Sequence, residues 1–192
     1  MTGTQKREGD KACQATPCGA TQRQNLQNQV YNDLKRGEKF FAVGNVAMLS
    51  EPLLGLIASR ECPGHVLLET LDRVSGWVKA DRVIVSGFHS PLEQQVLRSV
   101  LRRKGCVVKV LARGMTDYRP ATEEREPLAT GRMLVITACP PEVRRTTRET
   151  ALARNRLVLA LASEIIVPFV ADGSPLAALL GGQQWQRRND WS

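Results

Sequence analysis

The chain has 192 residues, enough for one domain with flanking segments, and 42% of them are hydrophobic, which suffices for one ordinary core. It carries 27 Lys and Arg against 19 Asp and Glu, and the net charge of +8 is spread along the chain rather than gathered in a basic tail. No run approaches the roughly 20 apolar residues of a membrane span, and residues 1–19 lack the apolar stretch of a secretory signal. We therefore expect a cytoplasmic protein without membrane contact.

The elements predicted along the chain fall into a polar beginning and a regular remainder. Residues 1–22 predict a flexible leader, residues 23–34 a polar helix, and residues 39–43 a short apolar run followed by a short helix at 46–49. Apolar strands and helices then alternate: strands at 53–58, 82–85, 106–111, 132–137 and 164–170, helices at 63–79, 90–105 and 146–162 and from Ser174 onward, a polar loop at 115–130, and a tail at 183–192.

This alternation defines the predicted fold. Strands that are apolar throughout, separated by helices of ten or more residues, are typical of a parallel sheet covered on both faces. The prediction is a doubly wound, mostly parallel, Rossmann-like α/β domain over residues 23–182. Three helix starts carry capping signals: Ser90 with Pro91 and Glu93, Thr146 with Glu149, and Ser174.

Ligands of open parallel sheets bind outside the carboxyl ends of the strands, so the residues after each strand are the candidate site. Ser59 and Arg60 follow one strand, Ser86 and Gly87 the next, and Arg113 the third. Small residues there expose backbone N–H groups to an anion, and arginines add bidentate contacts. A tight strand-to-helix turn at Ser86-Gly87 is the structural alternative.

Other charged and nucleophilic groups give weaker signals. Two basic clusters, at 98–104 and 144–148, are explained equally by a solvated helix face and by phosphate binding. His89 is typical of a surface loop. No nucleophile–base arrangement, dinucleotide fingerprint or P-loop is present, and the five cysteines have no metal-binding spacing. We therefore expect reduced thiols, no metal, no NAD or ATP or other cofactor, and a binding protein rather than an enzyme.

The series of motifs resembles a known family. Its members in chain order are Phe41-Ala42-Val43-Gly44-Asn45, Ile57-Ala58-Ser59-Arg60, Val83-Ile84-Val85-Ser86-Gly87, Val110-Leu111-Ala112-Arg113-Gly114, and Arg154-Asn155-Arg156 before Ile165-Ile166-Val167. Each motif is short, but their order and spacing over about residues 39–180 resemble the DprA/Smf family of DNA-processing proteins. That family belongs to the wider Rossmann-like group that also contains the LOG phosphoribohydrolases.

The resemblance implies a function and a set of contacts. The family binds single-stranded DNA and loads a recombinase onto it, notably during transformation, so DNA uptake or recombination is the implied process. Arg60 would contact a phosphate, Ser59, Ser86 and Gly87 would form the pocket floor, and Arg154 and Arg156 would form its far wall. Asn155 would hold the turn or contact a phosphate. We expect a divergent member that lacks the accessory domains.

Two other functions stay open. One is a pocket for a nucleotide derivative, either a sensor or a LOG-like N-glycoside hydrolase. The hydrolase needs a Pro-Gly-Gly-x-Gly-Thr segment and a downstream glutamate, where this chain has Asp172-Gly173-Ser174. The other is a partner-binding scaffold, with which a homodimer through exposed helix faces is compatible.

Overall fold

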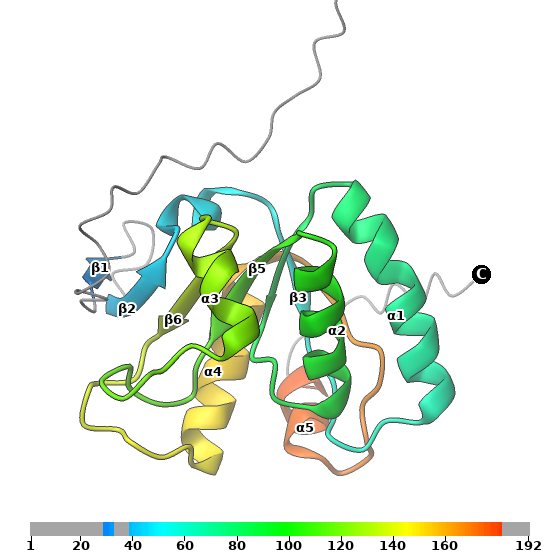
Figure 1. The fold of residues 1–192 in the computed structure, drawn as a ribbon. Helices are drawn as coiled ribbons and strands as arrows, with labels where there is room; N and C mark the ends of the chain where they lie inside the picture. The colour runs from blue at the N-terminus through cyan, green and yellow to red at the C-terminus, as the bar shows by residue number, and fades with distance from the viewer. Residues whose placement is uncertain (1–28, 33–38, 182–192) are drawn as a thin grey trace, which may run out of the picture.

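The structure is a computed structural model that describes residues 29–32 and 39–181. Its seven strands form one sheet in the order β1-β2-β6-β5-β4-β3-β7 (Figure 1). The strands are β1 (Gln29–Asn32), β2 (Lys39–Gly44), β3 (Leu53–Leu56), β4 (Val83–Ser86), β5 (Cys106–Val110), β6 (Met133–Thr137) and β7 (Ala162–Ile166). The five strands from β6 to β7 in this order are parallel, whereas β2 pairs antiparallel with both β1 and β6.

Helices cover both faces of the sheet. They are α1 (Gly64–Lys79), α2 (Pro91–Arg102), α3 (Thr122–Ala129), α4 (Arg148–Leu161) and α5 (Pro175–Gly181), with a short 3-10 helix at Val46–Ser50. Side chains alternate along each strand, so Leu54 and Ile84 join a core with α1 and α2, while Leu53 and Val83 join a second core with α4 and α5. The predicted doubly wound, mostly parallel Rossmann-like fold is confirmed.

The polar helix predicted at residues 23–34 is wrong where the structure describes it. Residues 29–32 form β1, whose register pairs Val30 with Phe41 and Tyr31 with Phe40 of β2. Backbone pairing with an available sheet edge outweighs weak local helix propensity here, and valine and tyrosine are both good strand residues. The rest of the predicted helix, the leader at 1–22 and the tail at 183–192 lie outside the described residues.

Three further features differ from the prediction: one additional helix and the ends of two elements. The polar loop at 115–130 contains α3, a helix that the sequence pattern concealed because only Glu124 and Pro127 of its residues are buried. The N-cap of α4 is Thr147 rather than Thr146, since the Thr147 hydroxyl accepts a hydrogen bond from the backbone N–H of Thr150 at 3.2 Å. The last strand spans 162–166 instead of 164–170.

The crossovers place the loops that matter. From β3 the chain proceeds through β4 and β5 to β6 by way of α1, α2 and α3, all on one face, and then returns over the other face as α4 to reach β7 beside β3. The loops at the carboxyl ends of β3, β4, β5 and β6 therefore share one edge of the sheet, the lower edge in Figure 1. We call it the strand-end edge. No described helix has the length and apolar character that a bilayer crossing requires.

Candidate functional site

The centre of the strand-end edge is a contact between Gly87 and Arg154. Gly87 follows β4, and Arg154 lies in the second turn of α4. A Cβ atom built at Gly87 would lie 2.5 Å from Nε and 2.9 Å from Cζ of Arg154, so the guanidinium lies directly against the glycine backbone. Only glycine leaves room for this approach.

Arg60 and His89 complete the cluster from two other loops. Nη2 of Arg60, after β3, donates a hydrogen bond of 3.1 Å to Nε2 of His89, after β4. The structure therefore brings Arg60, Gly87 and Arg154 together, as the sequence predicted for these three positions. We call Arg60, His89 and Arg154 the cation cluster. It combines two permanent charges with an imidazole whose pKa is lowered by burial and by the two arginines.

Glu93 lies beneath the cation cluster and holds two loops together. Its carboxylate is 3% exposed. Oε1 accepts from the backbone N–H of Ala58 at 3.0 Å, and Oε2 accepts from the N–H groups of His89 at 2.7 Å and Ser90 at 3.2 Å. The bonds to His89 and Ser90 come from the loop after β4, and the bond to Ala58 comes from the segment after β3. One buried carboxylate thus fixes the spacing of the two loops that carry Arg60 and His89.

Burial and mutual repulsion shift the pKa values in the cluster. Burial lowers the pKa of Arg154, the nearby charge of Arg60 lowers it further, and the Glu93 charge opposes both. The pKa of His89 is lowered first by burial and then by the charges of Arg154 and Arg60. Burial raises the pKa of Glu93, while its three backbone donors and Arg154 act in the opposite direction. The two guanidinium charges thus exceed the single buried carboxylate of Glu93, and an anion would stabilise the excess positive charge.

The turn after β4 is strained. Phe88 has φ 47°, a left-handed conformation that is unusual for a bulky residue. Its N–H donates to the Ser86 hydroxyl at 3.1 Å, and its side chain is buried. Ser86 itself is 0% exposed, so its hydroxyl shapes this turn and has no surface to offer a ligand. The turn directs His89 outward beside Arg60.

Ser59 lies at the switch point of the sheet, between β3 and β7, where it joins two segments. Its N–H donates to the carbonyl of Phe169 at 3.0 Å, and its hydroxyl accepts from the N–H of Ala171 at 2.9 Å. The segment after β7 is therefore tied to the segment after β3. The predicted floor residues Ser59 and Ser86 are both buried and act on the surrounding backbone.

The three residues of the Arg-Asn-Arg motif have different positions. Oδ1 of Asn155 accepts hydrogen bonds from Nε and Nη2 of Arg154 at 3.1 and 2.9 Å, which orients the guanidinium. Arg156 is exposed. Two residues along a helix differ in direction by about 200°, so Arg156 projects from another side of α4 than Arg154. The resemblance implies that both arginines line the far wall of the pocket. The helical period instead directs their side chains to different sides of α4.

Arg113 lies in the loop after β5. An ion pair between β5 and α3 stabilises this region, and Tyr118 of the loop bonds to the same carboxylate. Nζ of Lys109 contacts Oε1 of Glu124 at 2.5 Å, and the hydroxyl of Tyr118 donates to Oε2 at 2.8 Å. Burial raises the pKa of Tyr118, as do the charge and hydrogen bond of Glu124, whereas the charge of Arg113 lowers it. Arg113 is half-buried and lies within electrostatic range of Tyr118.

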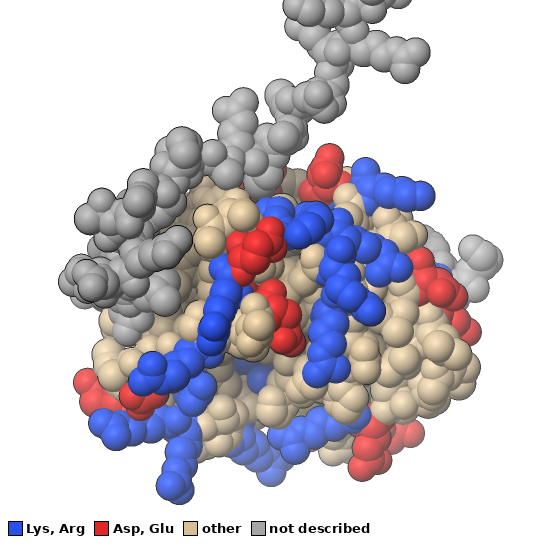
Figure 2. All heavy atoms as spheres, in the orientation of Figure 1, with Lys and Arg blue, Asp and Glu red and all other residues tan. Residues whose placement is uncertain are grey.

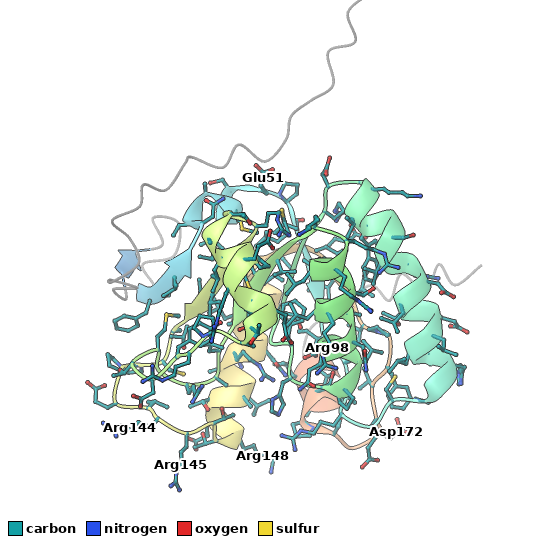
Figure 3. All side chains as sticks on the ribbon, viewed as in Figure 1. Glu51, Arg98, Arg144, Arg145, Arg148 and Asp172 are labelled. Carbon is teal, nitrogen blue, oxygen red and sulfur yellow. The ribbon has the colours of Figure 1, made fainter. Side chains whose placement is uncertain are left out.

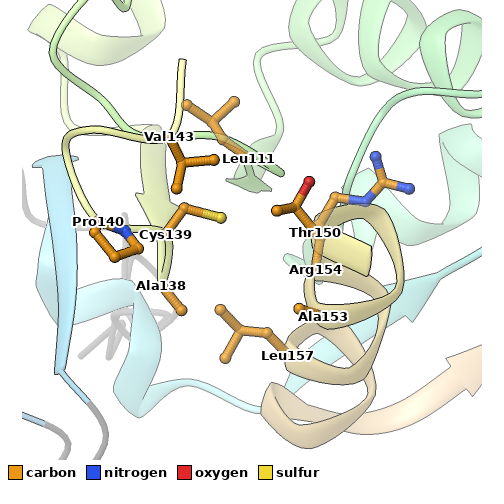
Figure 4. Close-up of a pocket in the computed structure, with 9 residues that line it drawn as sticks. All are labelled: Leu111, Ala138, Cys139, Pro140, Val143, Thr150, Ala153, Arg154 and Leu157. Atoms are coloured by element: carbon orange, nitrogen blue, oxygen red, sulfur yellow. The ribbon is translucent and has the colours of Figure 1, made fainter. Parts of the chain in front are cut away.

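A cavity of about 220 Å³ opens beside the cluster, between the ends of β5 and β6 and the helix α4 (Figure 4). It is lined by Leu111, Ala138, Cys139, Pro140, Val143, Thr150, Ala153, Arg154 and Leu157. Figure 4 shows the aliphatic stem of Arg154 at its border, with the guanidinium directed away from it. Of the predicted site residues only Arg154 borders this largely apolar space.

Sequence reasoning missed the importance of Glu93 and His89. Glu93 was explained as a capping-box residue, and that capping box with Ser90 is present. Its second bond, to Ala58, joins residues 35 positions apart and has no local signal. The position of His89 in the sequence is typical of a surface loop, and the residue is exposed, but it lies between two arginines.

The fold and this edge define a Rossmann-like α/β protein that gathers cations at the carboxyl ends of its parallel strands. The sequence model of the DNA recombination-mediator protein A family matches residues 27–174, and the chain belongs to that family. The resemblance to the DprA/Smf proteins is thereby confirmed. No curated protein sequence matches the chain.

Two solved structures share the fold. DNA processing protein A from Helicobacter pylori, whose structural report concerns its mode of single-stranded DNA binding, superposes with a TM-score of 0.64 at 21% identity. The match covers 80% of this chain and 74% of that protein. DNA processing protein A (DprA) from Streptococcus pneumoniae gives a TM-score of 0.56 at 24% identity, and the match covers 67% of this chain but only 45% of that protein.

Proposed function

We propose that this protein binds the phosphate backbone of single-stranded DNA along its strand-end edge, as part of DNA uptake or recombination. The observation that carries the proposal is the cation cluster, because Arg60 and Arg154 come from distant segments, lie within electrostatic range of each other, and outnumber the single buried carboxylate of Glu93 beneath them. Such a concentration of charge costs folding energy unless an anion uses it. Family membership and the DNA-binding report on the Helicobacter pylori protein support the choice of anion.

The proposed contacts differ in kind. Arg60 and Arg154 offer guanidinium groups suited to bidentate phosphate contact, and Arg113 extends the charge toward β5. Gly87 allows Arg154 to lie close to the backbone, and Asn155 orients it. Ser59 and Ser86 position the loops from within. Contacts of this type give affinity without reading the base sequence.

A nucleotide-derivative pocket is less well supported. In doubly wound folds such a ligand occupies the switch-point crevice. Here the segments on either side of that position are joined by two hydrogen bonds, one from the Ser59 N–H to the Phe169 carbonyl and one from the Ala171 N–H to the Ser59 hydroxyl. Binding of a long polyanion over the outside of the edge needs no such opening.

The first test measures affinity for oligothymidylate by fluorescence anisotropy across salt concentrations of about 50 to 200 mM. Wild-type affinity is expected to fall steeply with salt, and Arg60→Gln to reduce the log–log slope by about 0.7, the value for one single-strand phosphate contact. Lys79→Gln, an exposed cation at the end of α1, serves as the matched control and is expected to leave the slope unchanged. Wild-type protein that shows no binding at the lowest salt would disprove the proposed function.

The pH dependence of binding gives a second test, centred on His89. Its pKa in the free protein lies below the ordinary value of 6.5 because of burial and the two arginines. A bound phosphate favours the protonated imidazole, so binding takes up a proton and strengthens as pH falls below about 6.5, by at most about one log unit per pH unit. Stability of the free protein changes in the opposite sense. The unfolded chain protonates His89 first, so the stabilising contribution is complete above the unfolded pKa and is lost as pH falls through the folded pKa.

The variant His89→Gln removes the titrating group and keeps a polar side chain. Its affinity for oligothymidylate is expected to be nearly independent of pH between about 5.5 and 7.5, a range that spans the ordinary histidine pKa. An equal rise in affinity at low pH for wild type and His89→Gln would show that another group takes up the proton.

A further inference from the structure

The two basic clusters of the chain, at residues 98–104 and 144–148, differ in whether carboxylates lie near them. On α2 and the residue pair after it, Arg98 lies 4.0 Å from Glu123, Nζ of Lys104 lies 3.5 Å from Glu126, and Arg103 donates to the Ser99 hydroxyl. Glu123 and Glu126 of α3 thus offset part of this charge, although Glu126 also pairs with Arg132. The second cluster is Arg144, Arg145 and Arg148, which are all exposed and form no ion pair with any described residue.

The carboxylates nearest in sequence do not neutralise the second cluster. Glu142 precedes Arg144 and Arg145, and Glu149 follows Arg148. Both are exposed, and neither approaches an arginine within ion-pair distance in the described part of the chain. The three guanidinium groups remain available to an external anion.

The segment that leads into this cluster is anchored. The N–H of Gly114 donates to the carbonyl of Val143 at 2.7 Å, and the hydroxyl of Thr116 donates to the carbonyl of Pro141 at 3.2 Å. A Cβ at Gly114 would lie 2.5 Å from the carbonyl oxygen of Pro140, so the two loops are in direct backbone contact. The backbone is therefore held at Val143, just before Arg144, and again at Thr147, the N-cap of α4. Anchoring at both ends reduces the entropy lost when the arginines bind a ligand.

The cluster lies on the strand-end edge. Figure 3 shows Arg144, Arg145 and Arg148 projecting outward at the lower edge, whereas Arg98 lies on the face covered by α2. Figure 2 shows further Lys and Arg side chains along the same lower edge. Arg148 begins α4, the helix that also carries Arg154. Arg144, Arg145 and Arg148, which we call the basic loop, therefore lie on the same edge as the cation cluster (Figure 3).

We propose that Arg144, Arg145 and Arg148 form a second contact region for the DNA strand, so that the bound backbone runs along the strand-end edge from Arg60 and Arg154 to the loop before α4. This inference rests on the proposed function and adds the direction and extent of the binding surface. The α2 cluster takes no part in it, because it lies on the face covered by α2 (Figure 3) and two of its cations pair with carboxylates of α3.

The test compares two triple variants of the full chain that each lose three positive charges. Arg144→Gln/Arg145→Gln/Arg148→Gln removes the basic loop, and Lys79→Gln/Arg102→Gln/Arg103→Gln removes exposed cations at the carboxyl ends of α1 and α2. Binding of oligothymidylate of about 20 nucleotides, longer than the typical site of one domain, is measured against salt. The basic-loop variant is expected to reduce the log–log slope by about 2, from three contacts at roughly 0.7 each. The control is expected to keep the wild-type slope.

Oligonucleotide length separates the two regions further. Wild-type affinity is expected to rise between about 4 and 20 nucleotides as the strand reaches the basic loop, whereas the affinity of the basic-loop variant levels off at a shorter length. If wild type binds and both triple variants reduce the slope equally, or neither does, the second contact region is wrong while the proposed function stands. If wild type itself does not bind, the proposed function fails first.

Discussion

Replacing Glu93 by Ala is expected to lower the free energy of unfolding by about 3 kcal/mol. Three backbone N–H groups donate to this carboxylate, and those of Ala58 and Ser90 are in buried surroundings. Each buried donor left without a partner costs about 1–3 kcal/mol, and alanine supplies no acceptor. The loss is large because the carboxylate bonds to both strand-end loops at once.

Urea denaturation followed by circular dichroism measures this loss. Glu142→Ala is the matched control, since Glu142 is exposed and has no described partner, and it is expected to change stability by less than about 0.5 kcal/mol. Glu93→Gln keeps the shape and one acceptor oxygen, so its loss is expected to be intermediate. A loss below about 1 kcal/mol for Glu93→Ala would mean that water or a rearranged loop satisfies the freed donors.

Replacing Arg154 by Ala is expected to weaken single-stranded DNA binding roughly thirtyfold, or about 2 kcal/mol. The guanidinium is half-buried against Gly87 and oriented by Asn155, so it meets a phosphate with little loss of side-chain freedom. Arg156→Ala is the matched control on the same helix. Arg156 is exposed on another side of α4, and its removal is expected to change affinity only slightly.

Gly87→Ala tests the same geometry without removing a charge. The added Cβ would lie 2.5 Å from Nε of Arg154, so the flexible guanidinium end must move away, while the backbone of Gly87 needs no left-handed conformation. Affinity for oligothymidylate is expected to fall with little change in the urea midpoint. Equal losses of affinity for Arg154→Ala and Arg156→Ala, or full affinity for Gly87→Ala, would contradict the placement of Arg154 at the centre of the site.

The sequence predicted those parts of the site that depend on local pattern, and it did not predict those that depend on contacts between distant segments. Arg60 and Gly87 follow apolar strands of a parallel sheet, and the carboxyl ends of such strands meet at one edge, so their proximity follows from pattern alone. The distinction between Arg154 and Arg156 needed the helical period and the orientation of α4 on the sheet. The difference between the two basic clusters depended on which of them faces the carboxylates of α3, a helix that the sequence pattern did not predict.

The doubly wound architecture follows from the residue pattern alone, because apolar runs of strand length alternate with amphipathic helices and leave few other ways to bury both faces of a sheet. The same pattern places the candidate surface at the strand ends. Which of the named residues reach that surface depends on contacts between distant segments of the chain. Ser59 and Ser86 are both buried, Ser59 is bonded to a segment more than 100 residues away in the sequence, and Glu93 joins the two strand-end loops beneath the cation cluster. The burial of a side chain and its hydrogen-bond partners depend on residues distant in the chain. A local sequence pattern therefore does not predict them.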